Sequence, residues 1–489
     1  MSRALPDSAR RGWCPGLSRP MPTGDGLLAR IHPPLGVLSL AQSRAVAEGA
    51  RRYGNGHLDL TARANLQIRG VTEATTAPLA ALLDQVGLGD TRRDGGPQRL
   101  TLTSPLAEAG LSALAKAIED IGRGVPGLPP KTLVAVGMAM DEADLSVLPL
   151  AADRVAIVAG TSAWECGSDD TPSAIGALLA AFVATGQRRM RDVNPDALRR
   201  CEPSEAIQGS ATSQSLAGKL IPPLTPPHPE VPRSGLEGGL QTAPRSLEPS
   251  FEASAALRHL RMRSRVKEPP TSRSDTQNVA PLDRFAPLAM TVAVPAPGLS
   301  THDGRPVLAL DAPFGRCAVG AWERLIAVAE DIGAPEIRLS PSRGMVLLPS
   351  RPERIRLADL AADFIVAADD PRRAVAACTG APACASGSTP TLLDAARLAE
   401  TFRPLAARGL SAHVSGCAKG CAKPGPADLT LVGHEGAYAI IVGGAPGDSH
   451  QLEVPIEAAL ERLGRAATLG LAAAFASATN DGGRNRRPA

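Results

Sequence analysis

The chain has 489 residues, a length that allows about three or four domains, each large enough to bury its own core. Its formal net charge is only +3, which excludes the global basic field that is typical of nucleic-acid binding proteins. We therefore expect no nucleic-acid partner, and we expect ligands to be recognised at local sites.

The first residues and the apolar stretches predict a cytoplasmic protein. Residues 1–7 contain no apolar run that could form the core of a signal peptide. The longest apolar stretches, at 174–184 and 469–478, are far shorter than the ~20 residues that cross a membrane. In such a chain the eight cysteines are better interpreted as including metal ligands than as a disulfide framework.

An α+β unit is predicted near the amino terminus. Alternating apolar residues indicate strands within 26–31 and 58–68, and helical spacing indicates a helix over 41–50. A turn within 58–68 carries Arg63. A single arginine in such a turn is most often a solvated residue.

Two segments that follow carry no site of their own. Residues 122–127 match G-x-G-x-x-G, but nearby prolines prevent the helix whose amino terminus would hold a pyrophosphate, so we predict a turn. Residues 201–283 are dense in Pro, Ser, Thr and Gly, which predicts a long linker without stable structure.

The α+β unit recurs after this linker. Strand patterns at 307–310 and 337–348 flank a helical pattern at 321–329, and Arg343 lies in the turn between two strands, as Arg63 does. We therefore predict an internal duplication, in which the two arginines occupy equivalent places. Because pockets favour domain interfaces, a ligand is expected between the halves.

Four cysteines near the carboxyl terminus have metal-ligand spacing. Cys378 and Cys384 form a C-x5-C pair, and Cys417 and Cys421 form a C-x3-C pair. Zinc sites usually keep two to four residues between paired cysteines, so the wider pair favours an iron–sulfur cluster. A zinc site and unrelated thiols remain open at this point. The other cysteines lack such spacing and are expected to be single thiols: Cys14, Cys166, Cys201 and Cys317.

Together, the duplication, the cysteines and the segment 61–67 resemble the nitrite and sulfite reductase superfamily, whose members carry a 4Fe-4S cluster and siroheme. Within it the chain is most similar to the precorrin-3B synthase family. That resemblance rests on residues 14–16, 19–28, 54–61, 128–131 and 415–421. It covers nearly the whole chain outside the linker.

The resemblance implies an α+β fold with a pseudo-two-fold duplication of a ferredoxin-like unit and reductase-type α+β domains. The implied divisions are a first ferredoxin-like half at 1–90, a domain without a cluster at 91–200, the linker at 201–283, a second half at 284–360 and a 4Fe-4S domain at 361–489.

The resemblance also implies an activity, which is a monooxygenase reaction in aerobic cobalamin biosynthesis. Precorrin-3A is hydroxylated with dioxygen and a lactone forms, and the electrons come from NADH, directly or through a donor protein. The implied cofactors are a 4Fe-4S cluster held by Cys378, Cys384, Cys417 and Cys421, and a non-haem iron, rather than siroheme. His57, His413, His434, Asp59 and Asp428 can ligate iron but show no triad spacing, so structural roles are expected for them.

The resemblance implies that three cations bind the carboxylates of the tetrapyrrole. Arg63 and Arg99 match superfamily arginines, and Lys131 matches the first lysine of a pair. Leu133 replaces the second lysine, which an anion reductase needs more than a synthase does. No catalytic residue is assigned. The alternatives are a siroheme-dependent sulfite or nitrite reductase and a zinc-stabilised tetrapyrrole-binding protein without redox chemistry.

Overall fold

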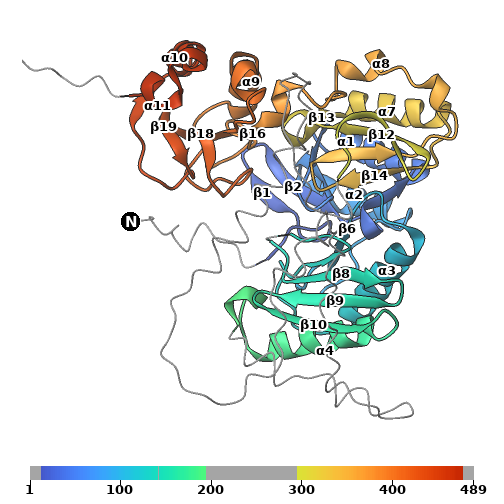
Figure 1. Ribbon diagram of the computed structural model, residues 1–489. Helices are drawn as coiled ribbons and strands as arrows, with labels where there is room; N and C mark the ends of the chain where they lie inside the picture. The colour runs from blue at the N-terminus through green and yellow to red at the C-terminus, as the bar shows by residue number, and fades with distance from the viewer. Residues whose placement is uncertain (1–12, 141, 194–293, 477–489) are drawn as a thin grey trace, which may run out of the picture.

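The computed structural model describes residues 13–140, 142–193 and 294–476. These residues form four five-stranded sheets and the helices that cover them (Figure 1). The predicted linker at 201–283 and Cys201 lie outside the described residues. Within the described ranges, no helix combines the length and the apolar character that a membrane span requires.

Two of the sheets belong to the duplicated units, and they exchange one strand each. The first has the order β1 (Met21–Thr23), β2 (Gly26–Ile31), β5 (Leu66–Val71), β4 (His57–Leu60), β13 (Arg316–Ala318). The second has the order β11 (Gly298–His302), β12 (Arg305–Asp311), β15 (Gly344–Leu347), β14 (Glu336–Ser340), β3 (Val37–Ser39). Strand β13 of the second copy thus completes the first sheet, and β3 of the first copy completes the second. The two copies cannot separate without losing a strand each.

One apolar core joins the two copies. Helix α1 (Leu40–Tyr53) contacts both α2 (Glu73–Asp84) and α7 (Val319–Asp331). Trp322 on α7 is fully buried and donates its Nε1–H to the carbonyl of Ser43 on α1, at 3.1 Å. A capping box between Ser39 and Gln42 fixes the start of α1. The exchanged strands and this shared core hold the two copies as one body.

The other two sheets share one pattern of strand directions. The third runs β10 (Ser162–Gly167), β9 (Arg154–Ala159), β8 (Leu145–Ala151), β7 (Val134–Val136), β6 (Thr101–Thr103), and the fourth runs β16 (Val375–Ala377), β17 (Ala412–Ser415), β18 (Ala427–His434), β19 (Ala437–Gly444), β20 (Leu452–Val454). In each, the first three strands along the chain are parallel and the last two join antiparallel.

Helices accompany these two sheets on different sides of the duplicated units (Figure 1). The third sheet has α3 (Ala109–Arg123) and α4 (Thr171–Ala184), and the fourth has α9 (Thr391–Ala406) and α10 (Ile456–Leu469). The short helices α8 (Ala358–Ala361) and α11 (Leu471–Ala474) complete the α-helices of the described ranges. The α+β class predicted from the sequence is confirmed.

In the two copies, the turns that carry Arg63 and Arg343 align one residue away from the predicted alignment. Ala64 and Arg343 both have a positive φ, of +49° and +65°, which is uncommon for residues other than glycine. The register of the flanking strands agrees with this alignment. Arg63 is therefore equivalent to Ser342, and Arg343 to Ala64. The prediction of two equivalent arginines is wrong, because the strand register, and not the residue type, fixes which turn residues are equivalent.

Candidate functional site

The two cysteine pairs leave the same edge of the fourth sheet. Strands β16 and β17 are parallel neighbours, so their carboxyl ends lie at one edge. Cys378 follows β16 and Cys417 follows β17. The N–H of Cys378 donates to the carbonyl of Val414 at 3.3 Å, which joins the two chain segments just where they leave the sheet. Cys384 and Cys421 lie further along the same two loops.

Small residues let these two loops approach each other. The N–H of Gly416 donates to Sγ of Cys378 at 3.1 Å. A Cβ atom on Gly416 would lie only 3.2 Å from the Cα atoms of Gly380 and Gly387. Gly380 itself has φ of +64°, a conformation that glycine adopts without strain. The glycines of the sequence motif therefore bring one loop within hydrogen-bonding distance of a cysteine of the other.

The cysteines of both loops lie near enough to one another to affect the ionisation of Cys417 and Cys421. Burial raises the pKa of Cys417 and of Cys421, and repulsion from the neighbouring cysteines raises both further. No group of three or more His, Cys, Asp or Glu side chains in the described ranges is placed to hold a metal ion. A zinc ion with 2.3 Å bonds needs its sulfurs about 3.8 Å apart, whereas an iron–sulfur cluster is a larger body.

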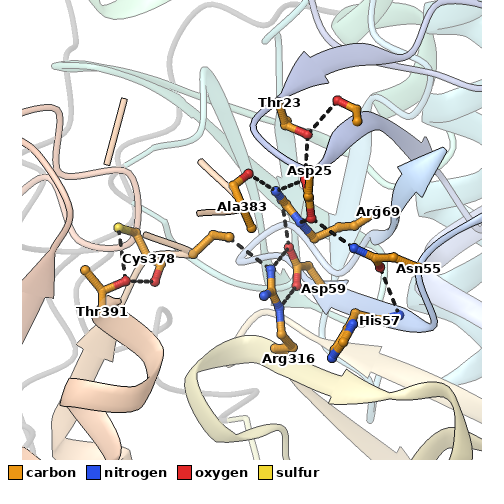
Figure 2. A network of polar contacts seen from close by, with 12 residues as sticks. Thr23, Asp25, Asn55, His57, Asp59, Arg69, Arg316, Cys378, Ala383 and Thr391 are labelled. Carbon is orange, nitrogen blue, oxygen red and sulfur yellow. Dashed lines mark hydrogen bonds and ion pairs between the residues drawn. The ribbon is translucent and has the colours of Figure 1, made fainter. Parts of the chain in front are cut away.

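A chain of ion pairs connects the first cysteine loop to the first sheet (Figure 2). The guanidinium of Arg69 contacts both oxygens of Asp25, at 2.9 and 2.7 Å, and one oxygen of Asp59 at 3.3 Å. Arg316 holds the same Asp59 at 2.6 and 3.1 Å. Arg69, whose side chain is 4% exposed, also donates to the carbonyl of Ala383 at 2.6 Å.

The residues predicted to bind a tetrapyrrole lie together, but Arg99 differs from the others. Arg63 donates to the carbonyl of Lys131 at 3.1 Å, and the Lys131 residue is exposed. Arg99 is buried and donates to the carbonyls of Pro33 and Ala64, each at 3.0 Å, and to the carbonyl of Arg63. Burial lowers the pKa of Arg99 to about 10. In this structure Arg99 therefore supports the turn that carries Arg63.

Two residues that the sequence reasoning missed belong to the same cluster. Arg30 on β2 donates through Nε and Nη2 to the side-chain oxygen of Gln67, at 3.0 and 2.6 Å. His32 follows that strand, and burial with the nearby charges of Arg30 and Arg99 holds its pKa well below the ordinary value. Neither Arg30 nor Arg63 forms an ion pair within the described residues, although burial lowers the pKa of both. An arginine and a histidine at the end of an otherwise apolar strand were the available signal.

The other candidate metal ligands have separate environments. His413 on β17 is fully buried, neither ring nitrogen has a partner within the described residues, and burial lowers its pKa to about 4. His434 is exposed and contacts Glu453, while Asp428 accepts hydrogen bonds from Ser411. His57 is exposed on β4. The first two residues of the segment 122–127 end α3, where a turn had been expected, and residues 124–127 form the predicted turn.

Comparison with known proteins first gives the class. Residues 19–86 match the nitrite/sulfite reductase ferredoxin-like half domain. The structure is similar to that of the NirA protein of Mycobacterium tuberculosis, with a TM-score of 0.56 and 18% identity over 90% of this chain and 80% of that chain. The protein therefore has a nitrite and sulfite reductase fold with ferredoxin-like units, as predicted.

Relatives found by sequence similarity then indicate the family within this class. A precorrin-3B synthase of Sinorhizobium sp is 31% identical over 474 residues, which cover 94% of this chain and 89% of the relative. A ferredoxin–nitrite reductase of Leptolyngbya laminosa is 30% identical over 27% of this chain and 28% of its own. A sulfite reductase hemoprotein β-component of Xanthomonas euvesicatoria is 32% identical over 29% of this chain and 28% of its own. The chain belongs to the precorrin-3B synthase family.

Proposed function

We propose that the chain is a monooxygenase that converts precorrin-3A to precorrin-3B in the cytoplasm, with dioxygen as oxidant, electrons derived from NADH, and lactone formation. The full-length relative supports this reaction more than the two reductases do, because each reductase matches less than a third of the chain. The same relative implies a tetrapyrrole substrate, whose rim of carboxylates requires cations in the site.

One observation carries the substrate assignment. Arg30 and Arg63 are half-buried, and neither forms an ion pair among the described residues, although Cys14 lies beside Arg30 and Glu142 and Asp144 lie near Arg63. Charged side chains removed from water are normally paired, so two neighbouring guanidinium groups that form no ion pair favour an anionic ligand. We assign Arg30, Arg63 and Lys131 to the substrate carboxylates. Arg99 positions Arg63 through the three backbone carbonyls that it holds.

The site lacks a second lysine where an anion reductase would need one. The side chain of Leu133 is 2% exposed and packs in the apolar core, while its N–H donates to Asp144 at 3.0 Å. Position 133 therefore offers no cation to a small bound anion. This arrangement favours the synthase over a sulfite or nitrite reductase.

We assign the four paired cysteines to a 4Fe-4S cluster, which when bound would supply single electrons to the reaction. Cys378 and Cys417 are held at the sheet edge, and the N–H of Gly416 donates to the Cys378 sulfur, as amides near cluster sulfurs do. For the non-haem iron that the family implies, the described residues offer no set of three ligands, so we assign none. Siroheme is not part of the proposal.

The test is incubation of the anaerobically purified full chain with precorrin-3A, dioxygen and a reducing system. We expect a product one oxygen atom heavier than the substrate. Arg63→Ala should raise KM for precorrin-3A about tenfold, because one charge-assisted hydrogen bond to a carboxylate is lost. An extracted siroheme chromophore, with sulfite or nitrite reduction, would instead establish the reductase alternative. Stoichiometric zinc without iron would contradict both enzymes.

A further inference from the structure

Three arginines contact residues that are the immediate chain neighbours of the proposed cluster ligands. Arg69 donates to the carbonyl of Ala383, which precedes Cys384, at 2.6 Å. Arg316 donates to Oγ1 of Thr379, which follows Cys378, at 3.2 Å. Arg343 donates to the carbonyl of Ala422, which follows Cys421, at 2.7 Å.

All three arginines come from the duplicated units, whereas the cysteines belong to the fourth sheet and its loops. Arg69 lies on β5, and Arg316 lies on the exchanged strand β13. Arg343 lies in the turn between β14 and β15. The two duplicated units contain no cluster ligand, but their arginines contact both loops that carry the ligands.

The three arginines differ in how their charge is balanced. Arg69 and Arg316 share Asp59, and Arg69 also holds Asp25, so these four side chains form a balanced, largely buried chain (Figure 2). Arg343 forms no ion pair within the described ranges, and burial lowers its pKa. The paired arginines are rigid donors, because each guanidinium is fixed by at least one carboxylate before it reaches the loop.

We propose that Arg69, Arg316 and Arg343 form a clamp that positions the cysteine loops for cluster binding. This inference rests on the proposed cluster. Both loops are rich in glycine and alanine, so ordering them costs conformational entropy. The clamp provides this order from a preformed scaffold and keeps the thiols near their ligand positions. The arginines are positioning residues and need not touch the cluster.

Two variants remove single contacts of the clamp without breaking its ion pairs. Thr379→Val removes the acceptor of Arg316 but leaves the Arg316–Asp59 pair, and Thr379→Ser restores the hydroxyl. Arg343→Gln removes the bond to Ala422 and disrupts no ion pair described here. Arg324→Gln is the matched control, since the exposed Arg324 on α7 holds Asp363 and contacts none of the clamp's acceptors.

The first measurement is the alkylation rate of each cysteine in the full chain after cluster removal, followed by peptide mass spectrometry. We expect Thr379→Val to speed labelling of Cys378 about tenfold and Arg343→Gln to speed labelling of Cys421 about tenfold, the factor for one lost hydrogen bond. Labelling of Cys166 should not change. The second measurement is iron loss from the reconstituted chain to a chelator, which both variants should accelerate while Thr379→Ser and Arg324→Gln should not.

Wild-type labelling and iron-loss rates in both Thr379→Val and Arg343→Gln would overturn the clamp. Equal acceleration of Cys378, Cys421 and Cys166 would also overturn it, because that pattern reports general loosening of the fold. If the reconstituted wild-type chain binds no iron and sulfide, the cluster proposal fails. The labelling pattern then still decides whether the clamp exists.

Discussion

Replacement of Arg99 by Met tests whether this residue positions Arg63 or binds substrate itself. The guanidinium of Arg99 donates to three backbone carbonyls, and hydrogen bonds from charged donors contribute about 1.5–3 kcal/mol each, or about 4.5–9 kcal/mol together. Burial lowers the pKa of Arg99 from its ordinary value to about 10, so removal of the charge regains about 3 kcal/mol. Its acidic neighbour Glu119 stays satisfied by the N–H groups of Leu100 and Thr101.

The expected net loss for Arg99→Met is therefore about 1.5–6 kcal/mol, and its midpoint of ~4 kcal/mol lowers the unfolding temperature of the affected unit by about 8–16 °C. Calorimetry of the full chain measures this shift. Binding of precorrin-3A should weaken as well, since the Arg63 turn loses its support. Lys131→Met serves as the comparison, because that exposed residue should affect binding but not stability. If Arg99→Met unfolds at the wild-type temperature yet fails to bind precorrin-3A, Arg99 is a direct ligand and this reasoning is wrong.

Further substitutions test the other parts of the site. Cys421→Ser should abolish the cluster absorbance and the activity, and an active Cys421→Ser enzyme would refute the ligand set. Cys166→Ser should retain both, because Cys166 contacts Thr171 and the apolar core of the third sheet and is no proposed ligand. His413 links the stability of the fold to pH, because its pKa is about 4 in the fold against an ordinary 6.5. Its contribution to stability is therefore fully present above pH 6.5, and about 3 kcal/mol of the free energy of unfolding is lost as the pH falls to about 4. The urea midpoints of the wild type and of His413→Gln should approach each other as the pH falls from 6.5 to about 4. Midpoints that change in parallel over this range would contradict the role given to His413.

The duplication was predictable from the sequence because each copy repeats the same strand and helix periodicity. The exchange of β3 and β13 was not, because local periodicity indicates that a strand forms but not which sheet receives it. The position of Arg343 shows the same limit. The strand register, and not the sequence pattern, shows that Arg343 is equivalent to Ala64. Ala64 adopts a positive φ at this turn position, although it is not a glycine.

The site was predictable only in part, for a physical reason. Cysteine spacing indicates a metal centre because the ligand chemistry is local, and the parallel strands β16 and β17 explain how the pairs meet. The role of an arginine depends on what surrounds it. Arg99 and Arg63 look alike in the sequence. In the structure the guanidinium of Arg99 is surrounded by backbone carbonyls, whereas that of Arg63 donates to a single one. Arg69 and Arg316 gave no signal, since their partners are distant in the chain.

The most direct test of the proposed function is the origin of the new oxygen atom. The reconstituted chain would be given precorrin-3A and a reducing system under isotopically labelled dioxygen in ordinary water, and the product would be analysed by mass spectrometry. The proposed reaction predicts a product that carries one labelled oxygen atom. An unlabelled product, or turnover of sulfite or nitrite in place of precorrin-3A, would contradict it.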